Sequence, residues 1–350
     1  MKKPLKVFLD ANVIIRQGKP PGGPMFGRLV DLVKAGFITV LTTDLTKDEI
    51  AKKHVENDYD VVKDFGREHF RKIIEDVCGA SMPQINKGKI KDKLWKKHAK
   101  GVAEMFNALK AKTLSINEVK PSIVLGAYTQ KTGLFSGEGK KDQFPDAFIF
   151  ERVRTEASTN DRIVIISNDK DFAAAVKNEK LLSVLKSIED LFKKLGLQVK
   201  VPNIENFLDE QEDNIKELFD DELQNWRLDA SDVRDAEIEV SGVNRIELEE
   251  ITSFGAIGGG SNIIVVGNAT IDANISYTHP DWDTAIYDSE DGTLTPWDDD
   301  VSGEATVKVE VEFSMSIRVN KKGEPTEIEE ISFTDDSDLY VTLHPADEYK

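Results

Sequence analysis

The chain has little cysteine, and it has no long apolar run. Cys78 is the only cysteine among 350 residues, so an intrachain disulfide and a cysteine-based zinc cluster are both excluded. Chains without disulfides are typical of reducing compartments. No stretch approaches the roughly 20 apolar residues that a transmembrane helix needs. Asp10 interrupts the short apolar run after Lys2 and Lys3, which disfavours a secretory signal. We therefore expect a cytoplasmic protein with no membrane partner.

Histidine is scarce as well. The five histidines form no pair with the spacing of a metal site or of a nucleophile and its base. His54, His69 and His98 fall within polar helical patterns, so we expect them at the surface. The sequence thus gives no support for chemistry that depends on histidine.

The net charge of −18 conceals two different parts of the chain. Residues 228–350 hold 29 acidic and 7 basic side chains, whereas residues 1–227 hold 39 basic and 35 acidic ones. Residues 228–350 therefore have a net charge of −22, and residues 1–227 have a net charge of +4. Such a contrast bears on the partners of each part, because charge steers association and non-specific binding.

Residues 1–202 alternate between short apolar runs and helical patterns, which is typical of a parallel α/β sheet. Strand patterns cover KVFLDANVII from Lys6, FITVLTT from Phe37 and RIVIISNDKDF from Arg162. A long polar helical stretch, which we expect to break near Gly66, and a lysine-rich one at 89–112 lie between them. We expect a Rossmann-like α/β domain.

The pattern changes after residue 202. Residues 203–230 are acidic and helical, and we expect them to form a linker. Beyond them apolar and polar residues alternate, as in half-buried antiparallel strands, and NKKGEP at 320–325 is a hairpin-turn signal. We expect residues 231–350 to form a separate all-β domain, either a sandwich or a curved sheet.

Three carboxylates are expected at the carboxyl ends of strands. Asp10 follows the first apolar run, and Asp169 and Asp171 follow the run RIVII. Ligands of parallel α/β sheets collect at this edge. Carboxylates brought together there repel one another unless a cation joins them, and an all-oxygen cluster suits Mg²⁺ or Mn²⁺. The ordinary alternative is that each carboxylate caps the helix that follows it.

Two more acids have a structural and a functional interpretation. Thr46-x-x-Glu49 fits a capping box, in which Glu49 reaches back to the start of its helix. Asp146 follows Pro145 near a helix start, where a carboxylate complements the helix dipole. Asp146 also directly precedes the apolar AFIF, however, so it lies beside a buried face.

Together these segments resemble the PIN-domain nucleases. The family has a strand that ends in Asp (here FLDANVII), then a Glu early in the helix after the second strand (TKDEI). An Asp that opens a later helix (PDAFIF) and a last strand that ends in ISNDKDF follow in the same order. The resemblance covers about residues 5–195. The stretch between Glu49 and Asp146 is longer than in the small toxin-type members, and residues after about 200 have no counterpart.

The resemblance implies a metal-dependent endoribonuclease that leaves a 5′-phosphate and a 3′-hydroxyl. One or two Mg²⁺ or Mn²⁺ ions would activate water and stabilise the leaving oxygen. The implied catalytic and metal-binding acids are Asp10, Glu49, Asp146 and Asp169, with Asp171 as a further metal ligand. The implied accessory polar residues are Asn12, Asp142 and Ser167. The preference for RNA, single-stranded RNA in particular, over DNA comes from the resemblance alone.

Nine lysines lie from Lys87 to Lys112 against two acids, and Trp95 lies among them. A basic stretch with an embedded aromatic residue suits phosphate contacts and base stacking. The alternative is a solvated helix face with Trp95 packed onto the core. The residues that we expect to bind nucleic acid are Lys93, Trp95, Lys96, Lys97, Lys140 and Lys141.

Two other functions remain open. A haloacid-dehalogenase-like phosphatase also carries an Asp at the end of its first strand. In that family, however, the pattern at this place is D-x-D, with a second Asp two residues later. In this chain Asn12 occupies the position of the second Asp, the proton donor. The other alternative is an inactive PIN scaffold that binds RNA or protein, and the presence of all four acids argues against it because clustered carboxylates are destabilising.

The acidic domain also has more than one interpretation. Its densest acidic loop, at 278–303, does not match the calcium-loop pattern, and we expect it to be solvated. The charge contrast suggests a domain that restrains the nuclease by covering its groove or by mimicking nucleic acid. A protein partner, such as an antitoxin or a component of defence or RNA processing, is the other possibility.

Overall fold

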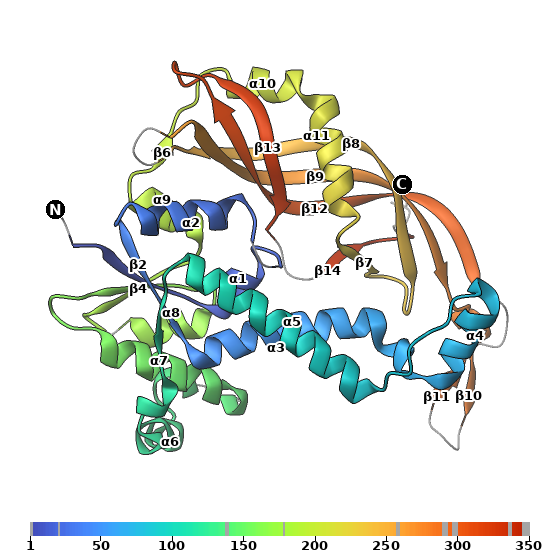
Figure 1. Cartoon of the computed structure of the whole chain (residues 1–350), viewed down its shortest axis with the longest axis horizontal. Coiled ribbons are helices and arrows are strands. Elements are labelled where there is room, and N and C mark those ends of the chain that lie inside the picture. The colour runs from blue at the N-terminus through green and yellow to red at the C-terminus, as the bar shows by residue number, and fades with distance from the viewer. Residues whose placement is uncertain are drawn as a thin grey trace, which may run out of the picture. The chain divides into compact units, whose positions relative to one another are not determined.

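The chain forms two compact units, Met1–Leu197 and Gln198–Lys350, and each is described by itself. Figure 1 shows the computed structural model. The structure describes residues 3–19, 22–136, 140–177, 179–256, 260–288, 293–295, 300–334 and 338–344. No helix among these residues has the length and apolar character needed to span a membrane.

A parallel five-stranded sheet forms the centre of the first unit, with the strand order β3-β2-β1-β4-β5. The strands are β1 (Leu5–Leu9), β2 (Ile38–Thr43), β3 (Lys112–Leu114), β4 (Ile163–Ile166) and β5 (Leu182–Leu185). Most residues of the central strands β1, β2 and β4 are buried, because helices connect the strands and cover the sheet (Figure 1). This arrangement confirms the expected α/β fold.

Helices connect the strands of this sheet. They are α1 (Ala11–Ile15), α2 (Pro24–Lys34), α3 (Asp44–Val62), α4 (Glu68–Cys78), α5 (Lys87–Ala108), α6 (Pro121–Gln130), α7 (Phe144–Glu156), α8 (Lys170–Val176) and α9 (Ile188–Lys194). Single 3₁₀ turns lie at η1 (Lys63–Gly66), η2 (Ile116–Glu118), η3 (Gly133–Phe135) and η4 (Lys140–Gln143). The turn η1 separates α3 from α4, so the break near Gly66 is confirmed.

The KVFLDANVII run is not one strand. The strand β1 ends at Leu9, and the apolar residues after Asp10 form the short helix α1. The carboxylate of Asp10 accepts a hydrogen bond from the Ala11 backbone N–H at 2.8 Å and so caps this helix. The local cap therefore prevails over the strand propensity of Val13 and Ile14, both of which are buried in the core.

Two histidines that we expected at the surface are buried. His54 of α3 and His98 of α5 stack with ring centroids 5.5 Å apart where these two helices pack together. Asp58 accepts hydrogen bonds from His98 Nε2 at 2.8 Å, Lys19 Nζ at 2.7 Å and Lys97 Nζ at 3.0 Å. Burial acts to raise the pKa of Asp58, but these three bonds outweigh it and hold the pKa below its ordinary value. Burial lowers the pKa of His54 to about 4.

The second unit contains a curled antiparallel sheet with the strand order β13-β12-β9-β8-β6. Its strands are β6 (Gln198–Val199), β8 (Glu237–Phe254), β9 (Asn262–His279), β12 (Val301–Val319) and β13 (Pro325–Phe333). Two small sheets accompany it, a parallel pair of β7 (Arg227–Ala230) with β14 (Asp338–Val341) and an antiparallel pair of β10 (Ile286–Asp288) with β11 (Thr293–Thr295). The expected all-β region is therefore present, while residues 289–292 and 296–299 of its acidic loop lie outside the described residues.

The large sheet buries one face and exposes the other. Along β12 the side chains of Val307, Val309 and Val311 are buried, and those of Lys308 and Glu310 between them are exposed. The interval 203–230 contributes two helices, α10 (Ile204–Glu210) and α11 (Glu212–Leu223), whose apolar residues belong to the same core. In that core the ring of Phe219 lies 5.6 Å from Phe313 and 5.3 Å from Phe333. The helices thus complete the hydrophobic core of this unit.

The strand β8 is irregular at the outer part of this sheet. Its register against β9 shifts at three places, between Val240 and Gly242, between Val243 and Arg245, and between Glu249 and Thr252. At the last shift Gly267 faces β8 so closely that a Cβ atom would lie 2.6 Å from the Glu249 carbonyl oxygen, so only glycine fits there. Among the described residues β8 pairs with β6 at Ser253 and Phe254 alone.

Candidate active site

The site begins where two neighbouring strands end. In the pairing of β1 with β4, Leu9 lies opposite Ile166, so Asp10 and Ser167 leave the sheet side by side. The Asp10 backbone N–H donates to the Ile166 carbonyl at 3.0 Å and continues the ladder by one bond. From β1 the chain continues to β2 on one side, while β4 lies on the other. This is the topological switch point, at which ligands of such sheets bind.

Asp10 is a buried carboxylate, 4% exposed, and both of its oxygens accept hydrogen bonds. Oδ1 accepts from the Ala11 N–H at 2.8 Å, and Oδ2 accepts from Ser167 Oγ at 2.7 Å. Burial nevertheless raises its pKa above the ordinary value. The capping role of Asp10 is therefore real, and it leaves a carboxylate whose negative charge is poorly compensated.

Ser167 joins the two strand ends. Its hydroxyl donates to Asp10 and accepts from the Asp169 backbone N–H at 3.1 Å. Asp169 in turn caps α8, because its Oδ1 accepts from the Asp171 N–H at 2.6 Å. Asp171 Oδ2 pairs with Lys140 Nζ. Ser167, Asp169 and Asp171 thus lie in one connected group with Asp10.

Glu49 does not cap its helix. The N-cap of α3 is Thr43, whose Oγ1 accepts from the Thr46 N–H at 2.9 Å, so Glu49 lies in the second turn. The capping-box interpretation of Thr46 and Glu49 is therefore wrong. Burial raises the pKa of Glu49 to about 7, and the charges of Asp146 and Asp10 act in the same direction.

Asp146 lies in the first turn of α7, after Pro145, as the sequence predicts. Burial raises its pKa to about 6, and the charges of Asp10, Asp169 and Asp171 act in the same direction. Because the pKa rises, the helix dipole does not dominate the environment of this carboxylate. Repulsion from other acids and loss of solvent determine it instead.

These shifts show that the predicted acids lie within electrostatic range of one another. The charge of Asp10 acts on both Glu49 and Asp146, and the charge of Asp169 acts on both Asp10 and Asp146. Within the described ranges, no group of three or more His, Cys, Asp or Glu side chains is arranged to hold a metal ion. The donor chemistry nevertheless fits a hard cation, because oxygen ligands with uncompensated charge suit Mg²⁺ or Mn²⁺. Metal binding by these acids stays a prediction.

Not every expected accessory residue contributes a described contact. Asn12 is exposed in the first turn of α1. The backbone of η4 includes Lys141 and Asp142, but the side chains of both lie outside the described part of the structure. Lys140 forms an ion pair with Asp171 beside the predicted acids, and its role in binding nucleic acid stays a prediction.

Some lysines of the basic helix α5 are exposed to solvent, and some form ion pairs with acidic residues. Trp95 is 39% exposed, so it is not packed into the core. Lys93 and Lys96 are exposed, and Lys96 forms an exposed ion pair with Asp92 at 2.8 Å. Lys97 is bound to Asp58 as described above. The nucleic-acid role of all of these residues stays a prediction.

Residues 7–172 match the sequence model of a family described as PIN domain. Neither the curated proteins nor the solved structures contain a match to the chain.

Replacing Glu49 by Gln should stabilise the metal-free protein in a pH-dependent way. The folded pKa of about 7 lies above the roughly 4.3 of an unfolded glutamate, so ionisation of Glu49 destabilises the fold as pH rises through this interval. At pH 8 with chelator the variant should therefore melt higher than the wild type. A gain of about 1 kcal/mol corresponds to roughly 2–4 °C in a unit of this size.

At pH 4 the difference should nearly disappear, since Glu49 is then protonated in the folded state and mostly protonated in the unfolded state. The control is Glu56→Gln, an exposed position on the same helix, which should change the melting temperature little at either pH. A variant that melts lower than the wild type at pH 8 would contradict the electrostatic account.

Proposed function

Because residues 7–172 form a PIN domain, we propose that this protein is a metal-dependent nuclease that hydrolyses phosphodiester bonds of RNA. The observation that carries the proposal is the set of mutually repelling carboxylates at the switch point between β1 and β4, with the pKa values of Glu49 and Asp146 raised. Such a set is costly to the fold, and residues that destabilise a protein are typical of functional sites.

The residues of the chain supply the framework for the reaction. Asp10, Glu49, Asp146 and Asp169 would hold Mg²⁺ or Mn²⁺, with Asp171 nearby. When bound, the ion provides a Lewis acid that polarises the phosphoryl group and makes water a better nucleophile. Ser167 fixes the orientation of the Asp10 carboxylate through its 2.7 Å hydrogen bond. Lys140 places a positive charge beside the acids, where it suits a phosphate oxygen of the substrate. The expected products carry a 5′-phosphate and a 3′-hydroxyl.

The exposed lysines of α5 support an RNA-binding role for that helix. Lys89, Lys93 and Lys96 follow one another at intervals of four and three residues and are all exposed, so they lie along one face of the helix. With a rise of 1.5 Å per residue they extend over about 10 Å. Trp95, which precedes Lys96 in the sequence and is 39% exposed, offers a ring for base stacking.

We also propose that the second unit, Gln198–Lys350, restrains the nuclease, because its negative charge competes with nucleic acid for basic surfaces. Its exposed sheet face carries pairs of glutamates across three strands. Glu239 and Glu304 flank Ser276, and the same register places Glu247 and Glu310 on either side of Thr270. All four carboxylates are exposed. A face of this kind repels nucleic acid and attracts basic surfaces.

Cleavage of single-stranded RNA by the purified chain is the first test. Activity should require Mg²⁺ or Mn²⁺, and Asp10→Asn and Asp146→Asn should each lower it by at least about 100-fold, since ligand loss should exceed the 10–100-fold typical of the residues that support metal ligands. The rise in melting temperature on addition of Mn²⁺ should also be lost in both variants. Asp60→Asn, an exposed position on α3, should behave as the wild type.

Single-stranded DNA and structured RNA belong in the same assay, because the acids do not choose between these substrates. Cleavage that survives chelation, or persists in both variants, would falsify the nuclease assignment. RNA binding without any cleavage by the wild type would favour the inactive scaffold. Hydrolysis of small phosphate monoesters alone would favour the phosphatase.

Replacing Lys89, Lys93 and Lys96 by Gln should lower the affinity for RNA and make that affinity depend less steeply on salt concentration. Each lysine that neutralises a phosphate contributes about 0.7 to the slope of log affinity against log salt for single strands, so the slope should fall by about 2. Fluorescence anisotropy over a range of salt concentrations measures it. The control replaces Lys177, Lys193 and Lys194, which are exposed elsewhere in the same unit, and should leave the slope nearly unchanged. Equal effects of the two sets would refute a specific role for α5.

Replacing Glu239, Glu247, Glu304 and Glu310 by Gln in the full chain should raise RNA cleavage by about threefold or more at low salt, because the competing negative charge is reduced. The difference should shrink as salt screens the charges. The matched control replaces Glu205, Glu210, Glu212 and Glu217 on α10 and α11, which changes the net charge equally. If both sets act alike, total charge explains the effect and the sheet face does not.

A further inference from the structure

The two helices that carry Glu49 and Asp146 come from distant parts of the sequence. Glu49 lies on α3 and Asp146 lies on α7, and the two helices touch. The two carboxylates can contribute to one site only if α3 and α7 keep a fixed position and rotation relative to one another. The segment from β3 to η2, residues 112–118, packs beside both helices and provides a common support.

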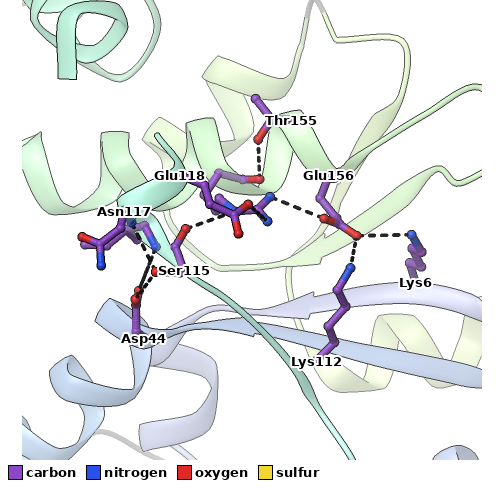
Figure 2. A network of polar contacts seen from close by, with 10 residues as sticks. Lys6, Asp44, Lys112, Ser115, Asn117, Glu118, Thr155 and Glu156 are labelled. Atoms are coloured by element: carbon purple, nitrogen blue, oxygen red, sulfur yellow. Dashed lines mark hydrogen bonds and ion pairs between the residues drawn. The ribbon is translucent and has the colours of Figure 1, made fainter. Parts of the chain in front are cut away.

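Asp44, the first residue of α3, binds this support from one side. Its Oδ2 accepts from Ser115 Oγ at 3.0 Å, and its Oδ1 accepts from the Ile116 backbone N–H at 3.1 Å. Figure 2 shows the Asp44 carboxylate directed at the Ser115 turn. Because Glu49 lies five residues further along the same helix, these bonds fix the start of the helix that carries it.

Arg152 of α7 binds the same turn from the other side. Its side chain is only 8% exposed, and its Nε donates to the Ser115 carbonyl oxygen at 3.2 Å. The two terminal nitrogens donate to Glu118 Oε2 at 2.6 Å and to Glu156 Oε2 at 3.4 Å. Asp146 lies six residues earlier on the same helix. A buried guanidinium with three directions of bonding allows little rotation of α7.

Two strands of the sheet, β1 and β3, anchor the far end of this network. Glu156 also pairs with Lys112 of β3 at 2.5 Å and with Lys6 of β1 at 3.7 Å, and Figure 2 shows both lysines converging on its carboxylate. The continuous path therefore runs from α3 through Asp44, the Ser115 turn and Arg152 to α7, with its end tied to the sheet. None of these side chains belongs to the acidic cluster itself.

We infer that Asp44 and Arg152 are positioning residues that set the separation of Glu49 and Asp146 by clamping α3 and α7 onto the Ser115–Glu118 turn. The inference rests on the proposed nuclease function. The clamp acts through geometry and not through charge alone, because lysine at position 152 would keep the charge but lose the planar fork that reaches Ser115, Glu118 and Glu156 together.

The test compares Arg152→Lys with Arg154→Lys in the full chain. Arg154 lies on the same helix and donates two 2.8 Å hydrogen bonds, both to Glu151. Because Glu151 also belongs to α7, these two bonds do not connect α7 to another element. Arg152→Lys should lower kcat by about tenfold and weaken Mn²⁺ binding, measured by the EPR signal of the free ion, by about tenfold. KM should stay within about twofold, because the lysines of α5 are untouched. Arg154→Lys should leave all three quantities near the wild-type values.

Asp44→Ala tests the other half of the clamp, with Asp60→Ala as its exposed control on the same helix. It should reproduce the losses of Arg152→Lys, and the double variant should lose no more than the more affected single variant, since either change already releases the turn. Ser115→Ala removes one bond to Asp44 and keeps the backbone carbonyl that Arg152 uses. It should give a smaller loss in the same direction and serves as the readout if the other variants fail to fold.

The outcomes separate the inference from the function beneath it. Wild-type chain that cleaves RNA and binds Mn²⁺, with Arg152→Lys, Asp44→Ala and Ser115→Ala indistinguishable from their controls or from the wild type, would overturn the clamp alone. Fully additive losses in the double variant would also overturn it. A wild-type chain that neither binds Mn²⁺ nor cleaves RNA would overturn the nuclease proposal and the clamp together.

Discussion

The hydrogen bond from Ser167 to the buried carboxylate of Asp10 joins the ends of two neighbouring strands, and the rest of the candidate site is arranged around it. Without it Asp10 would carry a buried charge with a single backbone donor, a costly arrangement in a core of Leu9, Ile14 and Ile166. The same hydroxyl receives the Asp169 N–H, so one serine fixes two of the predicted acids. The parallel register of β1 and β4 makes this possible, because it brings residues 157 positions apart into adjacent places.

Around this bond the first unit concentrates negative charge where solvent is scarce. Burial and mutual repulsion raise the pKa values of Asp10, Glu49 and Asp146. Ionisation of these three acids therefore destabilises the folded state. Elsewhere on α3 the carboxylate of Asp58 is matched by two lysines and a histidine. The contrast between a compensated cluster and an uncompensated one on the same helix α3 distinguishes structural acids from those suited to a ligand.

The sequence predicted the sheet, most helices and the grouping of the acids because these depend on local pattern and on the rule that strand ends share an edge. It failed where a local cap or a tertiary contact decides. Val13 and Ile14 have strand propensity, but the cap of Asp10 makes them helical. His54 and His98 lie in polar patterns and yet are buried, because each faces the other helix of a pair. Arg152 follows the apolar AFIF of α7 among other charged residues, Glu151 and Arg154, so the pattern does not single it out. Its partners on the Ser115 turn come from a segment with no pattern of its own.

The irregular strand β8 has a consequence for the behaviour of the chain in concentrated solution. An unpaired strand edge is a template onto which another molecule can add its own strand. In β8 the register shifts interrupt the row of backbone donors and acceptors, and exposed glutamates such as Glu237, Glu239 and Glu247 accompany it. A second chain approaching this edge would meet a kinked backbone and like charge. Register shifts and exposed charge are both features by which sheet proteins disfavour edge-to-edge association, and a regular strand of 18 residues would lack the shifts.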